Sequence, residues 1–126
     1  MAFNLHIIQT TDFVRLDGRG KPDLSESRKA LEGVAKACIE RGANAALIDL
    51  RHLQGHLTLT DLYQLIRAFH DMGFRHEQRV ALLHSYSGAQ NADFFAMCVS
   101  DQGWHVRSFN EFEEAMEWFA EELPVC

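Results

Sequence analysis

The segment from Ala45 to Arg51, with the sequence AALIDLR, constrains the fold more than any other part of the chain. It is apolar at nearly every position and lies between two segments with helical periodicity, a pattern typical of a strand covered on both faces. We therefore predict that it is the middle strand of an α/β sheet. Sites in α/β folds lie at the carboxyl ends of strands. Residues 51–61, which follow this strand, are the first place to look for a binding site.

Length and charge narrow the class of protein. The chain has 126 residues, which fits a single domain over residues 1–126. It has 12 Lys and Arg against 18 Asp and Glu, a formal net charge of −6, which disfavours a nucleic-acid partner. The sequence shows no signal peptide, and its apolar runs are shorter than the ~20 residues of a membrane span. Three cysteines without metal or redox spacing fit a reducing cytoplasm, where we expect the protein to be.

Periodicity and turn signals predict the element order β-β-α-β-α-β-α-β-α. Residues 3–9 and 12–17 are interpreted as a hairpin, followed by a loop at 18–22. Further strands are predicted at 79–85 and 104–109. Strands separated by helices pair in parallel through right-handed crossovers. The sequence therefore predicts an α/β fold with a mostly parallel sheet and helices packed against it.

Each of the four predicted helices has an apolar stripe at helical spacing. The stripes are Leu31, Val34, Ala35, Cys38 and Ile39; Leu62, Leu65, Ile66 and Phe69; Phe94, Phe95 and Cys98; and Phe112, Ala115, Met116, Phe119 and Leu123. Residue pairs of the capping-box type precede them: Asp23 with Glu26, Thr58 with Asp61, Ser87 with Gln90, and Asn110 with Glu113. Helix-ending glycines follow the first three: Gly42, Gly73 and Gly103.

Three stretches of the chain resemble the STAS or SpoIIAA-like fold family, which includes anti-sigma-factor antagonists and cytoplasmic domains of anion transporters. They are the strand-to-loop segment 47–55, the strand 79–83, and the closing strand and acidic helix at 106–119. This ending is similar to that of small bacterial SpoIIAA-like proteins of unassigned role. The resemblance implies a binding or regulatory module that has a protein partner, lacks a cofactor and is not an enzyme.

The same resemblance draws attention to residues 56–61, with the sequence HLTLTD. Phosphorylated members of the family have an Asp-Ser-Ser-Gly-like turn at the start of the helix after the central strand. Thr58 falls near the phosphorylated serine, but the flanking Asp, Ser and Gly are absent. Thr58 and Thr60 are candidate phosphosites, and with Asp61 and Tyr63 they form a candidate partner surface. The alternative is that Thr58 is only a helix N-cap.

A second candidate site uses positive charge at the strand ends. If the strands beginning near residues 12, 45 and 79 are parallel, their carboxyl ends meet at one edge, where helix N-termini add partial positive charge. A small anion or an acidic partner could bind there; the alternative is that these are solvated loop charges. The residues predicted at this edge are Arg19, Lys21, Arg51, His52, His56 and His84.

Other patterns assign no catalytic or metal site. The histidine pairs, such as His52 with His56, are joined by no Cys or carboxylate at ligand spacing, so we predict no metal; the alternative is that the histidines are solvated or hydrogen-bonded. The segment 84–88 lacks the first glycine of a nucleophile elbow, and Gly18-x-Gly20 lacks the rest of a phosphate loop. Trp118 and Phe119 lie on different sides of the last predicted helix, which makes an exposed aromatic patch and a homodimer one partner hypothesis.

Two classes of function remain. The first is a protein-binding or regulatory module, and the alternative is a small-anion or small-ligand binding domain that uses the strand-end loops. A pocket lined by Arg51, His52 and His84 would favour a ligand, whereas a flat apolar patch near Thr58 and Tyr63 would favour a protein partner. An enzyme would need a convergent acid, base and nucleophile, which sequence order does not show.

Overall fold

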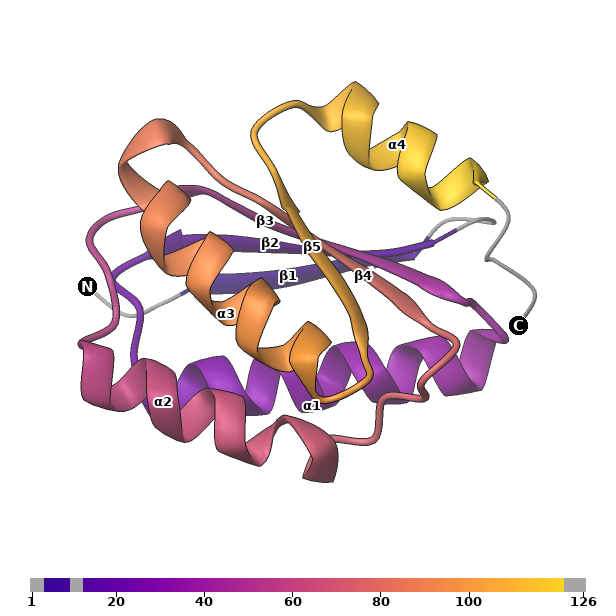
Figure 1. The fold of residues 1–126 in the computed structure, drawn as a ribbon, viewed down its shortest axis with the longest axis horizontal. Helices are drawn as coiled ribbons and strands as arrows, with labels where there is room; N and C mark the ends of the chain where they lie inside the picture. The colour runs from indigo at the N-terminus through magenta and orange to yellow at the C-terminus, as the bar shows by residue number, and fades with distance from the viewer. Residues whose placement is uncertain (1–3, 10–12, 122–126) are drawn as a thin grey trace.

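A single five-stranded sheet organises the molecule (Figure 1). The computed structural model describes residues 4–9 and 13–121 of the chain. The strand order is β1-β2-β3-β4-β5, so the predicted middle strand is central. β1 pairs antiparallel with β2, and β2 to β5 are parallel. The strands are β1 (Asn4–Gln9), β2 (Val14–Gly20), β3 (Ala45–Leu53), β4 (Arg79–Leu83) and β5 (His105–Phe109).

The helices lie on both sides of this sheet (Figure 1). Three pack on one face: α1 (Leu24–Arg41), α2 (Leu59–Ala68) and α3 (Ala89–Asp101). The fourth, α4 (Phe112–Ala120), packs on the other. Short 3-10 helices at Phe69–Asp71 and Tyr86–Gly88 follow α2 and precede α3. The predicted fold class and element order are confirmed. In the described part of the chain, no helix combines the length and the hydropathy that a membrane crossing requires.

β3 is apolar on successive residues because each face of the sheet has its own core. Side chains alternate along a strand, so Ala46 and Ile48 belong to the core under α1, α2 and α3. Leu47 belongs to the smaller core under α4. That second core is completed by Trp118, which is only 7% exposed.

Two of the predicted caps are confirmed. The Asp23 carboxylate accepts a hydrogen bond from the Glu26 amide at 3.1 Å at the start of α1, and the Thr58 hydroxyl accepts one from the Asp61 amide at 3.1 Å at the start of α2. Gly42 ends α1 in the left-handed conformation, with φ of 66°, which a residue with a Cβ rarely adopts.

The other two predicted caps are wrong. α3 begins after Gly88 without a side-chain cap, because the 3-10 turn already brings the chain into the helix; the Ser87 hydroxyl instead lies 3.1 Å from that of Ser85. α4 begins after Glu111, also without a side-chain cap. Asn110 is therefore one residue too early to serve as the N-cap.

Three further expectations are corrected. β2 continues to Gly20 instead of ending at residue 17, since Arg19 and Gly20 pair with β3 after a register shift. Ile39 is 54% exposed, because it lies just outside the buried arc of α1, which is centred on Val34 and Cys38. Trp118 is buried and Phe119 is half-buried, so they form no exposed aromatic patch. Residues 10–12 of the hairpin turn and Leu123 of the last stripe lie outside the described residues.

Candidate functional site

The loops that leave β2, β3 and β4 converge at the carboxyl edge of the sheet. Parallel pairing places Gly20 beside Leu53, and the Gln54 amide donates to the Gly20 carbonyl at 2.8 Å. The Asn91 side chain of α3 reaches the carbonyl of Leu57 in the β3–α2 loop at 3.5 Å. The predicted convergence of these loops is therefore present.

An apolar cavity of about 160 Å³ lies beneath these loops, between the sheet and α1, α2 and α3. Leu16 of β2, Ile48 of β3 and Leu82 of β4 form its floor, and each is at most 4% exposed. Its rim includes His56, which is exposed. The cavity is thus closed by the core at one end and reaches solvent at the loops.

The lining of the cavity is uncharged apart from one titratable residue. Its polar members are hydroxyl and amide side chains from α1, α3 and the β4–α3 loop: Ser27, Asn91, Ser85 and Ser87. Among the lining residues that the structure describes, His56 is the only titratable side chain, and none is Lys, Arg, Asp or Glu. Such a site suits an apolar molecule whose polar group lies near the rim.

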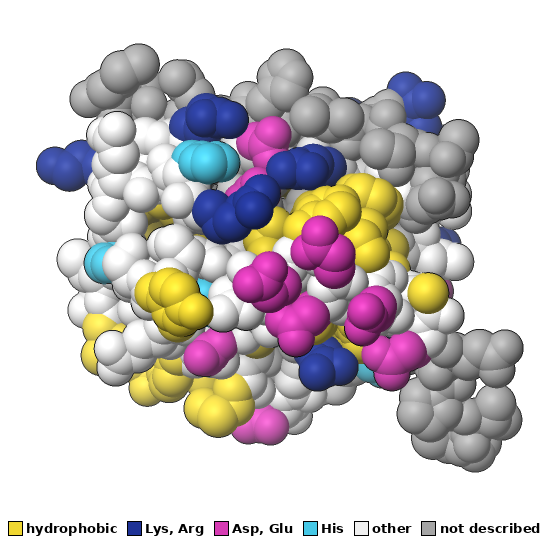
Figure 2. All heavy atoms as spheres, turned by 90° about the horizontal axis from the view of Figure 1, so that it is seen from above, with side chains coloured by type: hydrophobic (Ala, Val, Ile, Leu, Met, Phe, Trp, Pro, Cys, Tyr) yellow, Lys and Arg dark blue, Asp and Glu magenta, His cyan; other side chains and the backbone are white. Residues whose placement is uncertain are grey.

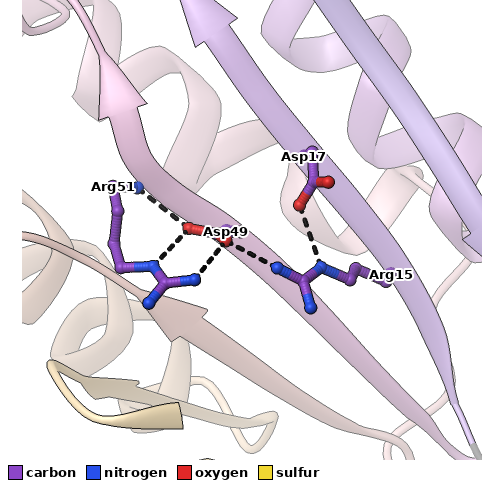
Figure 3. A network of polar contacts seen from close by, with 4 residues as sticks. All are labelled: Arg15, Asp17, Asp49 and Arg51. Atoms are coloured by element: carbon purple, nitrogen blue, oxygen red, sulfur yellow. Dashed lines mark hydrogen bonds and ion pairs between the residues drawn. The ribbon is translucent and has the colours of Figure 1, made fainter.

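A charged network occupies the opposite face of the sheet (Figure 3). Arg15 of β2 donates to Asp17 at 2.9 Å and to Asp49 of β3 at 2.8 Å. Arg51 donates to both carboxylate oxygens of Asp49, at 3.0 and 2.8 Å, and its backbone amide donates to the same carboxylate at 3.1 Å. Asp49 is 1% exposed. The network has two positive and two negative charges and joins β2 to β3.

The electrostatics of the network follow from this geometry. Burial raises the pKa of Asp49, but the hydrogen bonds from Arg51 and the charges of Arg51 and Arg15 outweigh burial, so the pKa lies below its usual value. The hydrogen bond to Asp49 raises the pKa of Arg51. The arginines are held by these carboxylates, which leaves less of their charge for an external anion.

The network lies beside α4. The Arg15 guanidinium is 5.8 Å from the centre of the Phe112 ring in the first turn of α4. Figure 2, which looks onto this side of the molecule, shows Lys and Arg side chains next to a band of Asp and Glu side chains. Glu113, Glu114 and Glu117 of α4 are exposed. This face therefore has charged side chains beside an apolar patch, which is also visible in Figure 2, while the cavity on the other face is lined mostly by apolar side chains.

Exposed apolar side chains gather on the outer side of α2 and α3. Leu59 is 62% exposed and Tyr63, one turn later in α2, is 50% exposed. The Tyr63 ring meets the Phe94 ring of α3 edge to face, with 5.5 Å between ring centres. Met97, one turn after Phe94, is 57% exposed. We call these three exposed residues, together with the half-buried Phe94, the α2–α3 surface.

Solved structures identify the fold. An uncharacterized protein of the DUF3478 family with a SpoIIAA-like fold, from Shewanella loihica PV-4, matches with a TM-score of 0.59 and 19% identity, over 94% of this chain and 93% of that one. The chain has the SpoIIAA-like fold. An anti-sigma factor antagonist from Mycobacterium paratuberculosis matches with a TM-score of 0.61 and 13% identity, over 95% and 96% of the two chains. The anti-sigma factor antagonist SpoIIAA, in its unphosphorylated form, matches with a TM-score of 0.51 and 16% identity, over 93% and 96%.

No family model and no curated protein matches the chain. The identities to the solved structures are low, so the comparisons identify the SpoIIAA-like fold alone. The role of this chain has to be inferred from its own residues. Within this fold, the predicted partner residues begin α2. Thr58 and Thr60 are exposed, Asp61 is half-buried, and Tyr63 lies on the α2–α3 surface. Thr58 is the N-cap, as its sequence context predicted, and its phosphorylation stays a prediction.

The residues of the predicted anion edge do not gather at the cavity of the SpoIIAA-like fold. His56 alone among the six lines it. Arg51 points to the α4 face, where it binds Asp49, because it lies two residues after Asp49 in the same strand. His84 is 7% exposed, and its Nδ1 lies 3.0 Å from the Ser85 carbonyl.

The three remaining residues of that edge are exposed. Arg19 and His52 are neighbours across the β2–β3 pairing, and Lys21 follows β2. The pocket that sequence analysis linked to Arg51, His52 and His84 is thus lined by other residues, whereas the apolar patch linked to Thr58 and Tyr63 is present. Anion binding by Arg19, Lys21 and His52 stays a prediction.

One cluster combines residue types of a catalytic triad, but its geometry differs. The Ser108 hydroxyl donates to the Asp93 carboxylate, and that carboxylate lies 3.7 Å from His84 Nε2. In a triad the hydroxyl contacts the imidazole that takes its proton. Here the carboxylate separates the two, so His84 does not activate Ser108. Among residues 4–9 and 13–121, no three His, Cys, Asp or Glu side chains are placed to hold a metal ion.

Sequence reasoning placed a possible ligand site at these loops, but it missed the charged network and most of the residues that line the cavity. The network had a signal: Arg15 and Asp17, and likewise Asp49 and Arg51, are two residues apart, and that spacing puts each pair on one face of its strand. The pairing of Asp17 with Asp49 in the sheet then brings the four together. The cavity had no such signal, because its volume depends on how three helices seat on the sheet.

Proposed function

We propose that the protein is a non-enzymatic binding module that docks a protein partner on the α2–α3 surface. The observation that carries this proposal is the cluster of exposed apolar side chains around Tyr63. Exposed apolar residues that stand alone are ordinary, but a contiguous group on neighbouring helices is characteristic of an interaction site. Aromatic side chains and Met are also enriched at protein interfaces.

Rigid placement supports the same proposal. Tyr63 is held against Phe94 by the ring contact, and Phe94 itself packs against the core. The inner side of α2 anchors the helix through Leu62, Leu65 and Ile66, which are at most 6% exposed. The surface is already ordered before a partner binds. Binding therefore costs little side-chain entropy on this side of the interface, which favours affinity.

The fold agrees with a partner of this kind. Two of the matching structures are anti-sigma factor antagonists, which are proteins named for their action on another protein. We extend the binding role, and not its target, to this chain. The expected partner presents apolar side chains that cover Leu59 and Tyr63.

A site-specific crosslink tests the proposal. The photoreactive residue p-benzoylphenylalanine replaces Tyr63 in the source cell, and illumination is expected to give one reproducible crosslinked product. The substitution Leu59→Glu is expected to lower its yield by about 10-fold or more, because a charge then lies in the centre of the contact. The measurement is the product's intensity on an immunoblot, with circular dichroism to verify the fold.

Ile39→Glu is the matched control. Ile39 is also a large apolar residue that is 54% exposed, but it lies in the last turn of α1, at the amino edge of the sheet. This variant is expected to leave the yield unchanged. A product that survives L59E, or that I39E removes equally, contradicts the proposed surface. The absence of any product contradicts the docking role.

A further inference from the structure

We propose that the cavity at the carboxyl edge of the sheet binds a small uncharged ring compound, aromatic or alicyclic, that carries one polar group. The site is separate from the α2–α3 surface, because α2 lies between the two. Leu62 and Leu65 face the cavity, while Leu59 and Tyr63 face outward. The inference therefore does not depend on protein docking.

The volume of the cavity sets the size of the ligand. The space is about 160 Å³. An engineered cavity of ~150 Å³ lined by Leu, Ile and Phe binds benzene. The lining here is of the same chemistry, with Leu16, Ile48 and Phe95 among its members. A single six-membered ring fits this space, whereas a long acyl chain does not.

The gradient of burial sets the orientation of the ligand. The floor residue Leu82 is 4% exposed, whereas Gly55, His56 and Ser87 at the rim are exposed. A ring that enters from the loops buries its apolar part against the floor. Its hydroxyl or carbonyl group then lies at the rim, where the Ser85 and Ser87 hydroxyls and the His56 imidazole supply hydrogen-bond partners.

The absence of fixed charge from the lining sets the charge of the ligand. No Lys, Arg, Asp or Glu of the described part of the chain lines the cavity, so an ionised carboxylate or ammonium would lose its hydration without gaining an opposite charge there. That desolvation is strongly unfavourable for an ion and mild for a single hydroxyl that keeps a partner. The site is therefore expected to take phenol in preference to benzoate, although the two rings have the same size.

A titration followed by ¹⁵N-¹H NMR tests the site, with phenol as the probe. We expect saturable amide shifts at the loops and walls of the cavity, including Leu57 and Gly88, with a Kd on the order of 1 mM or tighter. Benzoate is expected to bind at least about 10-fold more weakly. Ten-fold corresponds to ~1.4 kcal/mol, which is less than the cost of desolvating an unpaired carboxylate. The amides of α4 are expected to stay unchanged.

Two wall variants and a control locate the binding. Ala30→Leu in α1 and Ala92→Leu in α3 add volume from opposite sides of the cavity, and each is expected to weaken phenol binding by about 10-fold or more. Ala120→Leu adds the same side chain at the exposed end of α4 and is expected to have no effect. Phenol shifts that cluster on α4, benzoate binding equal to that of phenol, or wall variants that bind phenol like the unchanged protein would overturn the inference. The shift map of the unchanged protein decides the site even if both wall variants unfold.

Discussion

The two faces of the sheet are built on the same strands but differ in polarity and packing. On the face under α1, α2 and α3, Leu16, Ile48 and Leu82 line an apolar cavity that opens at the loops. On the face under α4, the neighbouring positions Arg15 and Asp49 form a network whose central carboxylate is 1% exposed. Strand alternation lets one sheet hold both environments. The cavity and both proposed binding sites thus lie on the three-helix side, whereas ion pairs join β2 to β3 on the α4 side.

The helix starts differ within the molecule as well. α1 and α2 have side-chain N-caps, Asp23 and Thr58, whereas α3 on the same side of the sheet and α4 on the other side have none. α4 is instead held from within by Ala115 and Trp118, and the buried Arg79 donates to the Trp118 carbonyl at its end. α4 is thus held by packing and by a buried polar contact at its end, whereas side-chain caps define the starts of α1 and α2.

The largest expected difference between the faces comes from one substitution made on each. Leu47 is fully buried under α4, and Leu47→Ala is expected to cost about 4 kcal/mol of unfolding free energy. Leu62 borders the cavity and already lacks neighbours on one side, so Leu62→Ala is expected to cost about 2 kcal/mol. Urea unfolding of both variants measures the two costs. Equal costs would mean that the cavity side is packed as tightly as the α4 side.

The charged network gives the next effect, and it depends on pH. Asp49→Asn is expected to cost about 2 kcal/mol near pH 7, because it leaves Arg15 and Arg51 short of a buried partner. The folded-state pKa of Asp49 is lowered, so its charge stabilises the fold above the unfolded value of about 3.9. That stabilisation is lost as the pH falls through the lowered pKa.

Urea unfolding from neutral to acidic pH measures this dependence. The difference between the unchanged protein and D49N is expected to narrow as the pH falls below about 4. Asp101→Asn, at an exposed residue that ends α3, is the matched control and is expected to show no such difference. A D49N cost that stays constant down to the lowest pH would show that charge is not what Asp49 contributes.

The smallest effect concerns the helix starts. Thr58→Ala removes the N-cap of α2 and is expected to cost about 1 kcal/mol, whereas Thr58→Asn keeps a capping side chain and is expected to cost little. Asn110→Ala at the uncapped start of α4 is expected to change stability by less than about 0.5 kcal/mol. Thermal unfolding of the three variants tests this order. A larger loss for N110A than for T58A would contradict the assignment of Thr58 as a cap and of α4 as an uncapped helix.

Much of the fold could be predicted from the sequence, because local patterns and burial agree in its central elements. The apolar run from Ala45 indicated the middle strand, and the stripe of Leu62, Leu65 and Ile66 indicated the buried side of α2. Periodicity predicted burial less well for residues at the edges of an apolar stripe. Ile39 continues the stripe of α1 but lies outside the buried arc. Trp118 was left out of the stripe of α4, yet it is buried in the core beneath that helix.

Less of the site could be predicted. Its composition depends on which face of the sheet each strand residue points to and on how the helices pack against the sheet. Arg51 and His52 were grouped by their place at the end of β3, yet Arg51 turns to the α4 face. Tyr63 was predicted as part of a partner surface, and its exposure agrees with that role. Its neighbours Phe94 and Met97 come from α3, and only the packing of two helices brings them to the same place.

A crystal pressurised with xenon tests the contrast between the two faces most directly. Xenon enters apolar cavities of this size and needs no hydrogen bond. We expect anomalous density between the sheet and α1, α2 and α3, in contact with Leu16, Ile48 and Leu82, and none beneath α4. Density beneath α4, or a cavity filled by its own side chains without xenon, would contradict the assignment of the binding space to the three-helix side.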